Sequence, residues 1–295
     1  MTRRFDVCVV GSANLDLVAT APELPRPGQT VLGTGFAEHA GGKGLNQAVA
    51  AARAGARTAF CGAVGDDDAA RRLLHVMDQD GVNRDSVRTV PDVPTGRALI
   101  GVSASGENSI IVVPGANACL QPVDVLEAAA SAATLLVQRE VPDDTVRAAL
   151  EAARAAGVIT ILNPAPASAI EQSTLALCDL IVPNEHEVEL LGGAERLLAG
   201  GATAVIVTLG ARGAMLLRQG LEPHLVAPFS VAAIDTTAAG DACCGALAAA
   251  LSAGVGIPEA LRFACAAGAL ATTCAGAVPS LPARSEIDRL INGAG

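Results

Sequence analysis

Short apolar runs alternate with longer Ala- and Leu-rich segments along most of the chain. The apolar runs predict buried strands, and they lie at 6–10, 58–61, 134–138, 158–162, 180–182 and 204–208. The longer segments have helical length and periodicity, and they lie at 45–54, 67–79, 122–132 and 144–156. Such strand–helix alternation predicts an α/β fold with a mainly parallel central sheet and helices on both faces.

Two regions interrupt this alternation. Residues 16–40 are rich in Pro and Gly, and 97–113 has the pattern of a hairpin with its turn at 104–108. Together they predict a small β-sheet that stands off the main body as a lid, although ordinary surface hairpins would give the same pattern. The expected division is an α/β domain and a β lid, formed by 1–13, 41–96 and 114–295, and by 14–40 and 97–113, respectively.

The last part of the chain predicts one more strand and two packed helices. The run 229–234 is strand-like, and 240–253 and 258–273 are helical segments rich in Ala and Gly.

Composition narrows the class of protein. The chain has 295 residues, of which 51% are hydrophobic and 17% charged, so it is long enough and apolar enough to fold around a sizeable core. The net charge is −10 without any Lys/Arg run, which argues against a nucleic-acid partner. The first apolar stretch, 7–10, is too short for a signal peptide or a membrane span. The eight cysteines form no Cys-x-x-Cys pair, which is typical of reduced thiols in a cytoplasmic protein.

The strongest candidate for chemistry is the segment 235–241, Asp-Thr-Thr-Ala-Ala-Gly-Asp, at the start of a predicted helix. The small residues Ala238, Ala239 and Gly240 leave the N–H groups of a helix N-terminus open to an anion. Asp241 in the first turn would face the same position and accept a proton from a hydroxyl group. The segment therefore suits phosphoryl transfer, whereas capping of the helix by Asp241 is the simpler interpretation.

A second candidate is the segment 40–46, Ala-Gly-Gly-Lys-Gly-Leu-Asn, before a predicted helix. The paired glycines would let a ligand approach the backbone, and Lys43 and Asn46 add polar groups, but the segment lacks the pattern of a Walker A loop. Asn14 and Asp16 follow the first strand, and their spacing points both side chains to one side of an extended segment. Such amide and carboxylate groups bind neutral sugar hydroxyls, although an Asx-turn would explain Asn14 and Asp16 equally.

Two further segments follow predicted strands at the edge where α/β proteins bind ligands. Asn184-Glu-His-Glu187 comes after the strand at 180–182, and it also has the pattern of a helix capping box. The segment 208–213, Thr-Leu-Gly-Ala-Arg-Gly, follows the strand at 204–208 and suits either a nucleotide site or a hairpin turn.

The order and spacing of these segments, together with Asn163-Pro-Ala-Pro166, resemble the PfkB carbohydrate kinase family, and its ribokinases most closely. The similarity extends from about Val7 to the final helix, and it is most specific in Gly-Gly-Lys-Gly-x-Asn and Ala-Ala-Gly-Asp. It implies a ribokinase-like fold whose β lid pairs with a second lid in a homodimer. It also implies ATP, Mg²⁺ and an activating K⁺ ion.

The resemblance assigns a role to each candidate residue. Asp241 would be the base that acts on the terminal hydroxymethyl of the sugar, and Ala238, Ala239 and Gly240 would form the anion hole. The implied sugar contacts are Asn14, Asp16, Gly42, Lys43, Asn46, Glu140 and Asp241. The implied nucleotide residues are Asn184, Glu187, Thr208, Gly210, Gly213, Gly240 and Cys265, with Glu187 helping to organise Mg²⁺ and phosphate. The implied K⁺ residues are Asp235, Thr237, Ala271, Cys274, Gly276 and Ser280, several of them through backbone carbonyls.

The chain departs from the family pattern at a few positions. Cys243 and Cys244 stand where an aromatic residue and a small or polar residue are usual. Cys265 replaces a polar residue that is common beside adenine, and Cys274 falls in the potassium loop. Arg139 beside Glu140 is also unusual. None of these changes affects Asp241.

Several alternatives remain open at this point. A nucleoside kinase should stack the base on an aromatic ring, but the substrate and lid segments offer only Phe36. A kinase of a phosphorylated sugar should have extra basic residues near the lid, where only Arg26 and Arg97 occur. The choice between ribose, deoxyribose and fructose depends on single hydroxyl contacts. Beyond kinases, a catalytically silent sugar sensor would retain this fold, whereas an oxidoreductase would carry Gly-x-Gly-x-x-Gly after the first strand.

Overall fold

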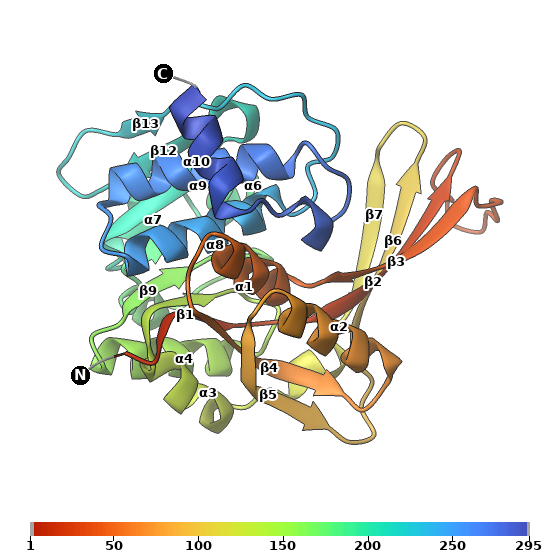
Figure 1. Ribbon diagram of the computed structural model, residues 1–295, viewed down its shortest axis with the longest axis horizontal. Helices are drawn as coiled ribbons and strands as arrows, with labels where there is room; N and C mark the ends of the chain where they lie inside the picture. The colour runs from red at the N-terminus through yellow and green to blue at the C-terminus, as the bar shows by residue number, and fades with distance from the viewer. Residues whose placement is uncertain (1–2, 294–295) are drawn as a thin grey trace.

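The computed structural model describes residues 3–293 and contains two separate sheets (Figure 1). The larger sheet has nine strands in the order β13-β12-β11-β10-β9-β8-β1-β4-β5. These strands are β1 (Phe5–Val10), β4 (Thr58–Gly65), β5 (Asn83–Val90), β8 (Ala132–Val137), β9 (Ile159–Leu162), β10 (Leu180–Ile181), β11 (Ala204–Thr208), β12 (Ala214–Leu217) and β13 (His224–Val226). All neighbouring pairs from β5 to β11 are parallel, and only β12 and β13 are antiparallel. The prediction of a mainly parallel central sheet is confirmed.

Helices cover both faces of this sheet, because parallel strands require crossover connections. The helices are α1 (Lys43–Arg53), α2 (Asp68–Gln79), α3 (Pro122–Ala130), α4 (Asp143–Ala155), α5 (Gln172–Leu175), α6 (Glu185–Leu190), α7 (Ala194–Ala199), α8 (Ala239–Ser252), α9 (Ile257–Ala271) and α10 (Arg284–Gly293). One core lies between the sheet and α1, α2, α8, α9 and α10, and the other lies between the sheet and α3, α4, α5 and α7.

The smaller sheet stands away from the main body (Figure 1). Its strands are β2 (Asn14–Ala21), β3 (Gly35–Gly41), β6 (Gly96–Ser103) and β7 (Asn108–Val113), in the order β3-β2-β6-β7. The hairpin expected over 97–113 is therefore β6 and β7, and the Pro- and Gly-rich region supplies β2 and β3. We call these four strands the lid sheet.

The elements differ from the prediction at several places, and two of these differences are informative. Phe229–Ile234 forms no strand, because the hydrogen bonds of this segment run to a loop: the Ile234 N–H donates to the carbonyl of Thr272 rather than to a neighbouring strand. Conversely, β5 was not predicted, since it lies at the edge of the sheet, where six of its eight residues are polar and four are exposed.

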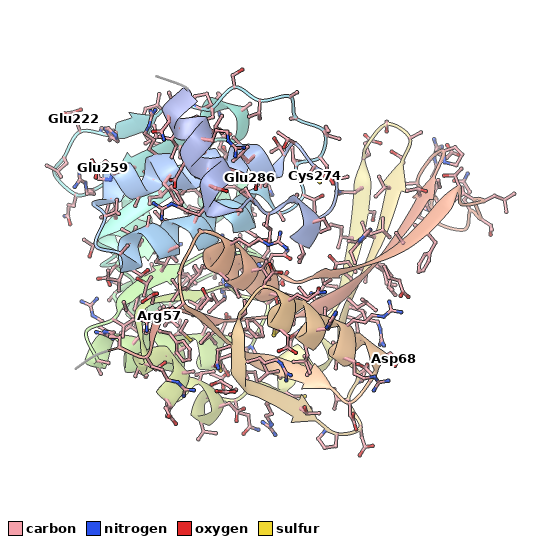
Figure 2. The ribbon with its side chains drawn as sticks, viewed as in Figure 1. Arg57, Asp68, Glu222, Glu259, Cys274 and Glu286 are labelled. Carbon is pink, nitrogen blue, oxygen red and sulfur yellow. The ribbon has the colours of Figure 1, made fainter. Side chains whose placement is uncertain are left out.

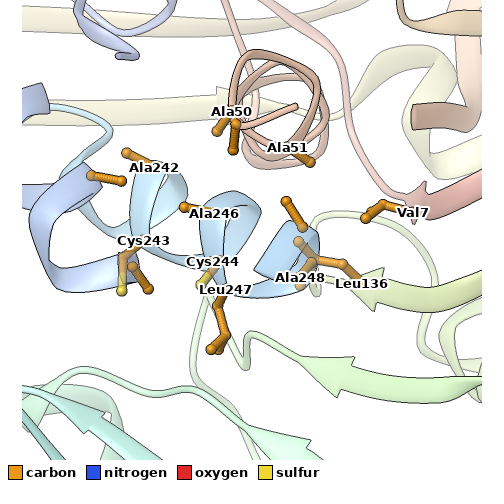
Figure 3. Packing of buried hydrophobic residues seen from close by; sticks show 14 of the residues in the cluster. Val7, Ala50, Ala51, Leu136, Ala242, Cys243, Cys244, Ala246, Leu247 and Ala248 are labelled. Carbon is orange, nitrogen blue, oxygen red and sulfur yellow. The ribbon is translucent and has the colours of Figure 1, made fainter. Parts of the chain in front are cut away.

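Helices α1 and α8 pack against each other at unusually short range (Figure 3). Ala50 and Ala51 of α1 face Ala242 and Ala246 of α8, and these small side chains bring the two backbones together. At Gly245 of α8, an added Cβ would lie only 2.5 Å from the carbonyl oxygen of Gln47. This contact joins the helix that follows the Gly-Gly-Lys-Gly segment to the helix that carries Asp241.

Short 3₁₀ helices lie at Gly115–Cys119, Gly210–Arg212 and Val278–Ser280. Within residues 3–293, no helix is long and apolar enough to cross a membrane.

Candidate active site

The candidate site lies where the strand order of the large sheet reverses. The chain builds β1, β4 and β5 in one direction and then continues from β8 on the opposite side of β1. In open α/β sheets the carboxyl ends of strands at such a point form a crevice that binds ligands. Here β1 is followed by Ser12, β8 is followed by Gln138 and Glu140, and β2 begins at Asn14.

Asp241 is buried in the first turn of α8, with 7% of its surface exposed. Its Oδ2 atom accepts a hydrogen bond of 3.0 Å from the side-chain amide of Asn46, and its Oδ1 atom accepts one of 2.9 Å from the amide of Gln47. The carboxylate is therefore directed across the interface toward α1. No side chain caps α8, so the interpretation of Asp241 as a simple helix cap is wrong.

The N-terminus of α8 is open. Ala238 precedes the helix in the left-handed conformation, with φ 58° and ψ 8°, which is uncommon for a residue with a Cβ. A Cβ added to Gly240 would meet no atom within 4 Å. A helix end with free N–H groups and open space beside it favours an anion, because the partial positive charge of the helix lies there. The predicted residues Ala238, Ala239 and Gly240 thus lie beside Asp241.

Glu140 lies beside the turn that starts α1. Its Oε2 atom accepts hydrogen bonds from the backbone N–H of Lys43, at 3.1 Å, and from the hydroxyl of Ser12, at 2.5 Å. Arg139 takes no part in this cluster. Its nearly buried guanidinium instead bonds Asp143 and the carbonyl oxygen of Ser168, so it supports the neighbouring loop.

Asn14 and Asp16 lie on the same face of β2, as their spacing predicts. The Oδ1 atom of Asn14 accepts a hydrogen bond of 2.7 Å from Asn117. Asp16 lies against the end of β3, where a Cβ on Gly41 would come within 2.1 Å of its Oδ2 atom. Gly42 follows with φ 88° and approaches the backbone N of Asn14 so closely that a side chain would not fit.

Three carboxylates and one lysine share the crevice, and their charges are coupled. Burial raises the pKa of Asp16 to about 7, and the negative charges of Glu140 and Asp241 contribute in the same direction. Burial acts to lower the pKa of Lys43, but Asp241, Glu140 and Glu187 outweigh it and hold that pKa above its usual value. Lys43 therefore stays charged and offsets part of the negative charge.

The residues expected at the nucleotide form a second group. Asn184 and Glu187 form the capping box of α6, since Asn184 Oδ1 accepts from the Glu187 N–H and a Glu187 carboxylate oxygen accepts from the Asn184 N–H, both at 2.8 Å. Asn184 also pairs as an isolated bridge with Thr208 at the end of β11. Gly210 and Gly213 bound the turn that joins β11 to β12. The capping box and the turn are both present, and a role with nucleotide remains a prediction.

Cys265 lies on α9, which packs against β12 and β13. Burial raises the pKa of Cys265 to about 11, and burial raises the pKa of Cys243 on α8 further. Both thiols are therefore protonated at neutral pH and act as small apolar side chains.

The residues expected at a potassium ion lie on two loops that the structure partly brings together. Asp235 accepts hydrogen bonds from Thr237, at 2.6 and 2.9 Å, and from the Gly276 N–H, at 2.9 Å. Burial acts to raise the pKa of Asp235, but these hydrogen bonds outweigh it and lower that pKa. Cys274 is exposed on the loop after α9 (Figure 2), and the hydroxyl of buried Ser280 donates to the carbonyl of Ala277. Ala271 ends α9 and precedes Thr272, whose carbonyl accepts a hydrogen bond of 3.1 Å from the Asp235 N–H.

Sequence reasoning missed several polar residues that complete the site. They are Ser12, Gln47, Asn117 and Gln138, all of them buried. Gln138 gave one signal, since it is a polar residue directly after the apolar residues 135–137. Nothing in the sequence linked Gln138 to Gln47, which is 91 positions away.

Comparison with known proteins places the whole chain in one family. The model for the pfkB family carbohydrate kinase matches residues 4–284. The ribokinase of Haemophilus influenzae is 39% identical over 298 residues, covering 96% of this chain and 97% of that protein. The ribokinase of Bacillus subtilis is 38% identical over 293 residues, covering 97% and 99%.

A solved structure gives the same result. The ribokinase of Arabidopsis thaliana, in complex with ribose and ATP, superposes with a TM-score of 0.89 at 34% identity, covering 99% of each chain. The expectation of a ribokinase-like fold is confirmed. The chain belongs to the pfkB family of carbohydrate kinases.

Proposed function

We propose that this protein transfers the γ-phosphoryl group of ATP to the terminal hydroxymethyl of a small sugar, most specifically D-ribose, to give ribose 5-phosphate. The observation that carries the proposal is the buried carboxylate of Asp241, held by two amides beside an open, uncapped helix N-terminus. The similarity to proteins named ribokinase, one of them in complex with ribose and ATP, supports this substrate pair.

In this proposal the sugar lies between the lid sheet and the start of α1. Asn14, Asp16, Lys43, Asn46 and Glu140 orient its hydroxyls, and the backbone at Gly42 comes close to it. The Oδ1 atom of Asn46 is buried without a partner among residues 3–293, so it is free to accept a sugar hydroxyl. Asp241 accepts the proton of the terminal hydroxyl as the phosphoryl group transfers in line.

The open end of α8 stabilises the charge that develops on the transferring group, chiefly through the N–H group of Gly240, because the Ala239 N–H already donates to the carbonyl of Thr236 at 3.3 Å. ATP extends from there toward Asn184, Thr208, Gly210 and Gly213, with Cys265 near its adenine ring. When bound to the phosphates, Mg²⁺ neutralises their charge, and Glu187 is the carboxylate suited to organise it. One oxygen of Glu187 is engaged in the capping box, which fixes its direction.

The loop residues fit a monovalent cation. Asp235 joins the two loops through Gly276, and backbone carbonyls and the Ser280 hydroxyl would supply further oxygens, which suit a hard cation such as K⁺. Asp235, Thr237, Ala271, Cys274, Gly276 and Ser280 would surround the ion. Such an ion would hold the loop before Ala238 in place and support the shape of the anion hole.

The deciding experiment measures ATP turnover with ribose, 2-deoxyribose, fructose, adenosine and pseudouridine, in potassium and in sodium. We expect the highest kcat/KM with ribose and higher activity in potassium. Preference for another sugar or for a nucleoside would overturn the assignment of ribose as the substrate but not the proposed kinase mechanism. Binding of a sugar without turnover would favour the silent sensor instead.

The ionisation of Asp16 predicts a pH dependence for sugar use. An ionised Asp16 accepts hydrogen bonds from sugar hydroxyls better than a protonated one, and its pKa is about 7. We therefore expect kcat/KM for ribose to fall as the pH drops below about 7, with kcat falling less. Because the pKa is raised in the folded chain, Asp16 also makes folding stability decrease as the pH rises toward 7.

Asp16→Asn tests this assignment, because asparagine keeps one acceptor and cannot ionise in this range. The acid decline of kcat/KM should disappear in the variant, at a higher KM. A decline that persists unchanged in Asp16→Asn would rule out Asp16 as its source.

The lid sheet supports the proposal of a homodimer. All six residues of β7 are exposed, and four of them are apolar: Ile110, Ile111, Val112 and Val113. A run of apolar residues on an edge strand normally requires a covering partner. A second lid of the same kind is suited to cover it, with Ile110 on the face of the sheet that also carries Asp16.

Ile110→Lys should convert the dimer to a monomer in sedimentation velocity, because a buried lysine at the contact would be unpaired. Leu225→Lys on β13 is the matched control, because Leu225 is also an exposed aliphatic residue, and this variant should remain dimeric. A monomeric unaltered protein, or a dimeric Ile110→Lys variant, would contradict the lid contact.

A further inference from the structure

A chain of buried side-chain amides leads from the central sheet to Asp241. The Nε2 group of Gln138, directly after β8, donates a hydrogen bond of 2.5 Å to the Oε1 atom of Gln47 on α1. The Nε2 group of Gln47 donates to Asp241 Oδ1, at 2.9 Å, and to Asn163 Oδ1, at 3.1 Å. Asn163, just after β9, in turn donates to the carbonyl of Val182, at 2.9 Å. Gln47 and Gln138 are both fully buried.

These contacts fix which way the Gln47 amide points. Its oxygen receives the N–H of Gln138, while its nitrogen faces two acceptor oxygens, on Asp241 and Asn163. A rotation of the amide by 180° would place its oxygen against both acceptors and its nitrogen against a donor. Only one orientation satisfies all the neighbours, and in that orientation Gln47 donates to Asp241.

The side chain of Gln138 fits only because residue 11 is a glycine, and one of its polar atoms stays unpaired. A Cβ on Gly11 would lie 1.9 Å from the Oε1 atom of Gln138, so a side chain at position 11 would displace it. The same Oε1 atom is buried without a hydrogen-bond partner among residues 3–293. Apolar residues at 47 and 138 would avoid an unpaired buried oxygen, so folding stability alone does not explain the two glutamines.

We propose that Gln47 is a positioning residue for the base, and that Gln138 and Asn163 fix the direction of its amide. Asn46 holds one carboxylate oxygen of Asp241 from the sugar side, and Gln47 holds the other from the core side. Together they set the plane of the carboxylate against the sugar hydroxyl. This inference rests on the proposed kinase function.

The test is the variant Gln47→Met, which keeps the length of the side chain and removes its polar groups. The net charge around Asp241 does not change, since the titratable groups that face it are Asp16, Lys43 and Cys244. We expect kcat with ribose to fall by about 10- to 100-fold with little change in the KM for ribose. The acid limb of kcat against pH should move to higher pH, because the ionised carboxylate loses a donor.

Gln138→Met provides an independent variant, with a smaller loss of kcat, because Gln47 then loses its orientation but not its amide. The double variant should be no slower than Gln47→Met alone, since both changes act through one hydrogen bond. Thr134→Val is the matched control: Thr134 lies on β8, the strand that precedes Gln138, and its hydroxyl is buried without a hydrogen-bond partner among residues 3–293. This control should retain the unaltered kcat and pH profile.

Unchanged kcat and an unchanged pH profile in folded Gln47→Met would overturn the proposal. The proposal would also be overturned if the losses of kcat in Gln47→Met and Gln138→Met multiplied in the double variant. Independent effects would mean that Gln138 does not act through Gln47. If Gln47→Met fails to fold, Gln138→Met alone must show the shifted pH profile, and its absence there rejects the role. A failure of the proposed function would differ, because the unaltered protein itself would then show no turnover.

Discussion

Replacing Asp241 by asparagine should lower kcat by about 10²- to 10⁴-fold, the range expected when a general base is removed. Asparagine has nearly the same shape and is expected to keep the fold, but it cannot accept the proton of the sugar hydroxyl. The KM for ribose should change much less, because Asn14, Glu140 and Lys43 remain to bind the sugar. Steady-state turnover and calorimetric titration with ribose would measure the two effects separately.

Asp144→Asn is the control for this substitution, since Asp144 is an exposed carboxylate at the start of α4. It should leave turnover unchanged. If Asp241→Asn kept the turnover of the unaltered protein, then Asp241 would not be the base, and the site would need another proton acceptor.

Replacing Gly245 by alanine should both destabilise the protein and lower its kcat. The added Cβ would meet the carbonyl oxygen of Gln47 at 2.5 Å and the Cβ of Ala50 at 2.6 Å, so α1 and α8 must move apart. Overpacking of this kind costs about 1–3 kcal/mol of unfolding free energy. The same movement separates Gln47 and Asn46 from Asp241, so kcat should fall even at temperatures where the variant is folded.

Chemical denaturation and turnover at low temperature would measure these two effects. Gly293→Ala is the control, because no atom lies within 4 Å of a Cβ at that position of α10. If Gly245→Ala had the stability and turnover of the unaltered protein, the α1–α8 contact would adjust to the added Cβ without loss of stability.

The elements predicted best from the sequence are those whose own residues are apolar enough to indicate burial. The run 204–208 is apolar except for Thr208 at its end, and it forms β11 with the predicted bounds, because a strand buried on both faces is largely apolar. β5 escaped prediction for the opposite reason, since its polar residues at the sheet edge satisfy no local pattern. Residues 229–234 were wrongly predicted as a strand because β-type composition alone does not provide a neighbouring strand.

The candidate site divided in the same way. Asp241 and Lys43 were identified through motifs that lie in continuous segments, and Glu140 through the family resemblance alone. Gln47 and Gln138 were not, because their role depends on a contact between residues 91 positions apart, made only when α1 packs beside the end of β8. A side chain whose partners come from three elements leaves no local signal in one sequence.

Phe36 on β3 gives the lid sheet a further use. It is 67% exposed, and the chain contains no tryptophan and no tyrosine. A tryptophan placed at position 36 would therefore be the only indole in the molecule, and its fluorescence would report the surroundings of the lid without background from the rest of the protein. Lid closure in kinases and similar enzymes takes microseconds to milliseconds, which stopped-flow and relaxation methods partly resolve. A movement of the lid sheet on sugar binding would thus be accessible to direct optical measurement with one substitution.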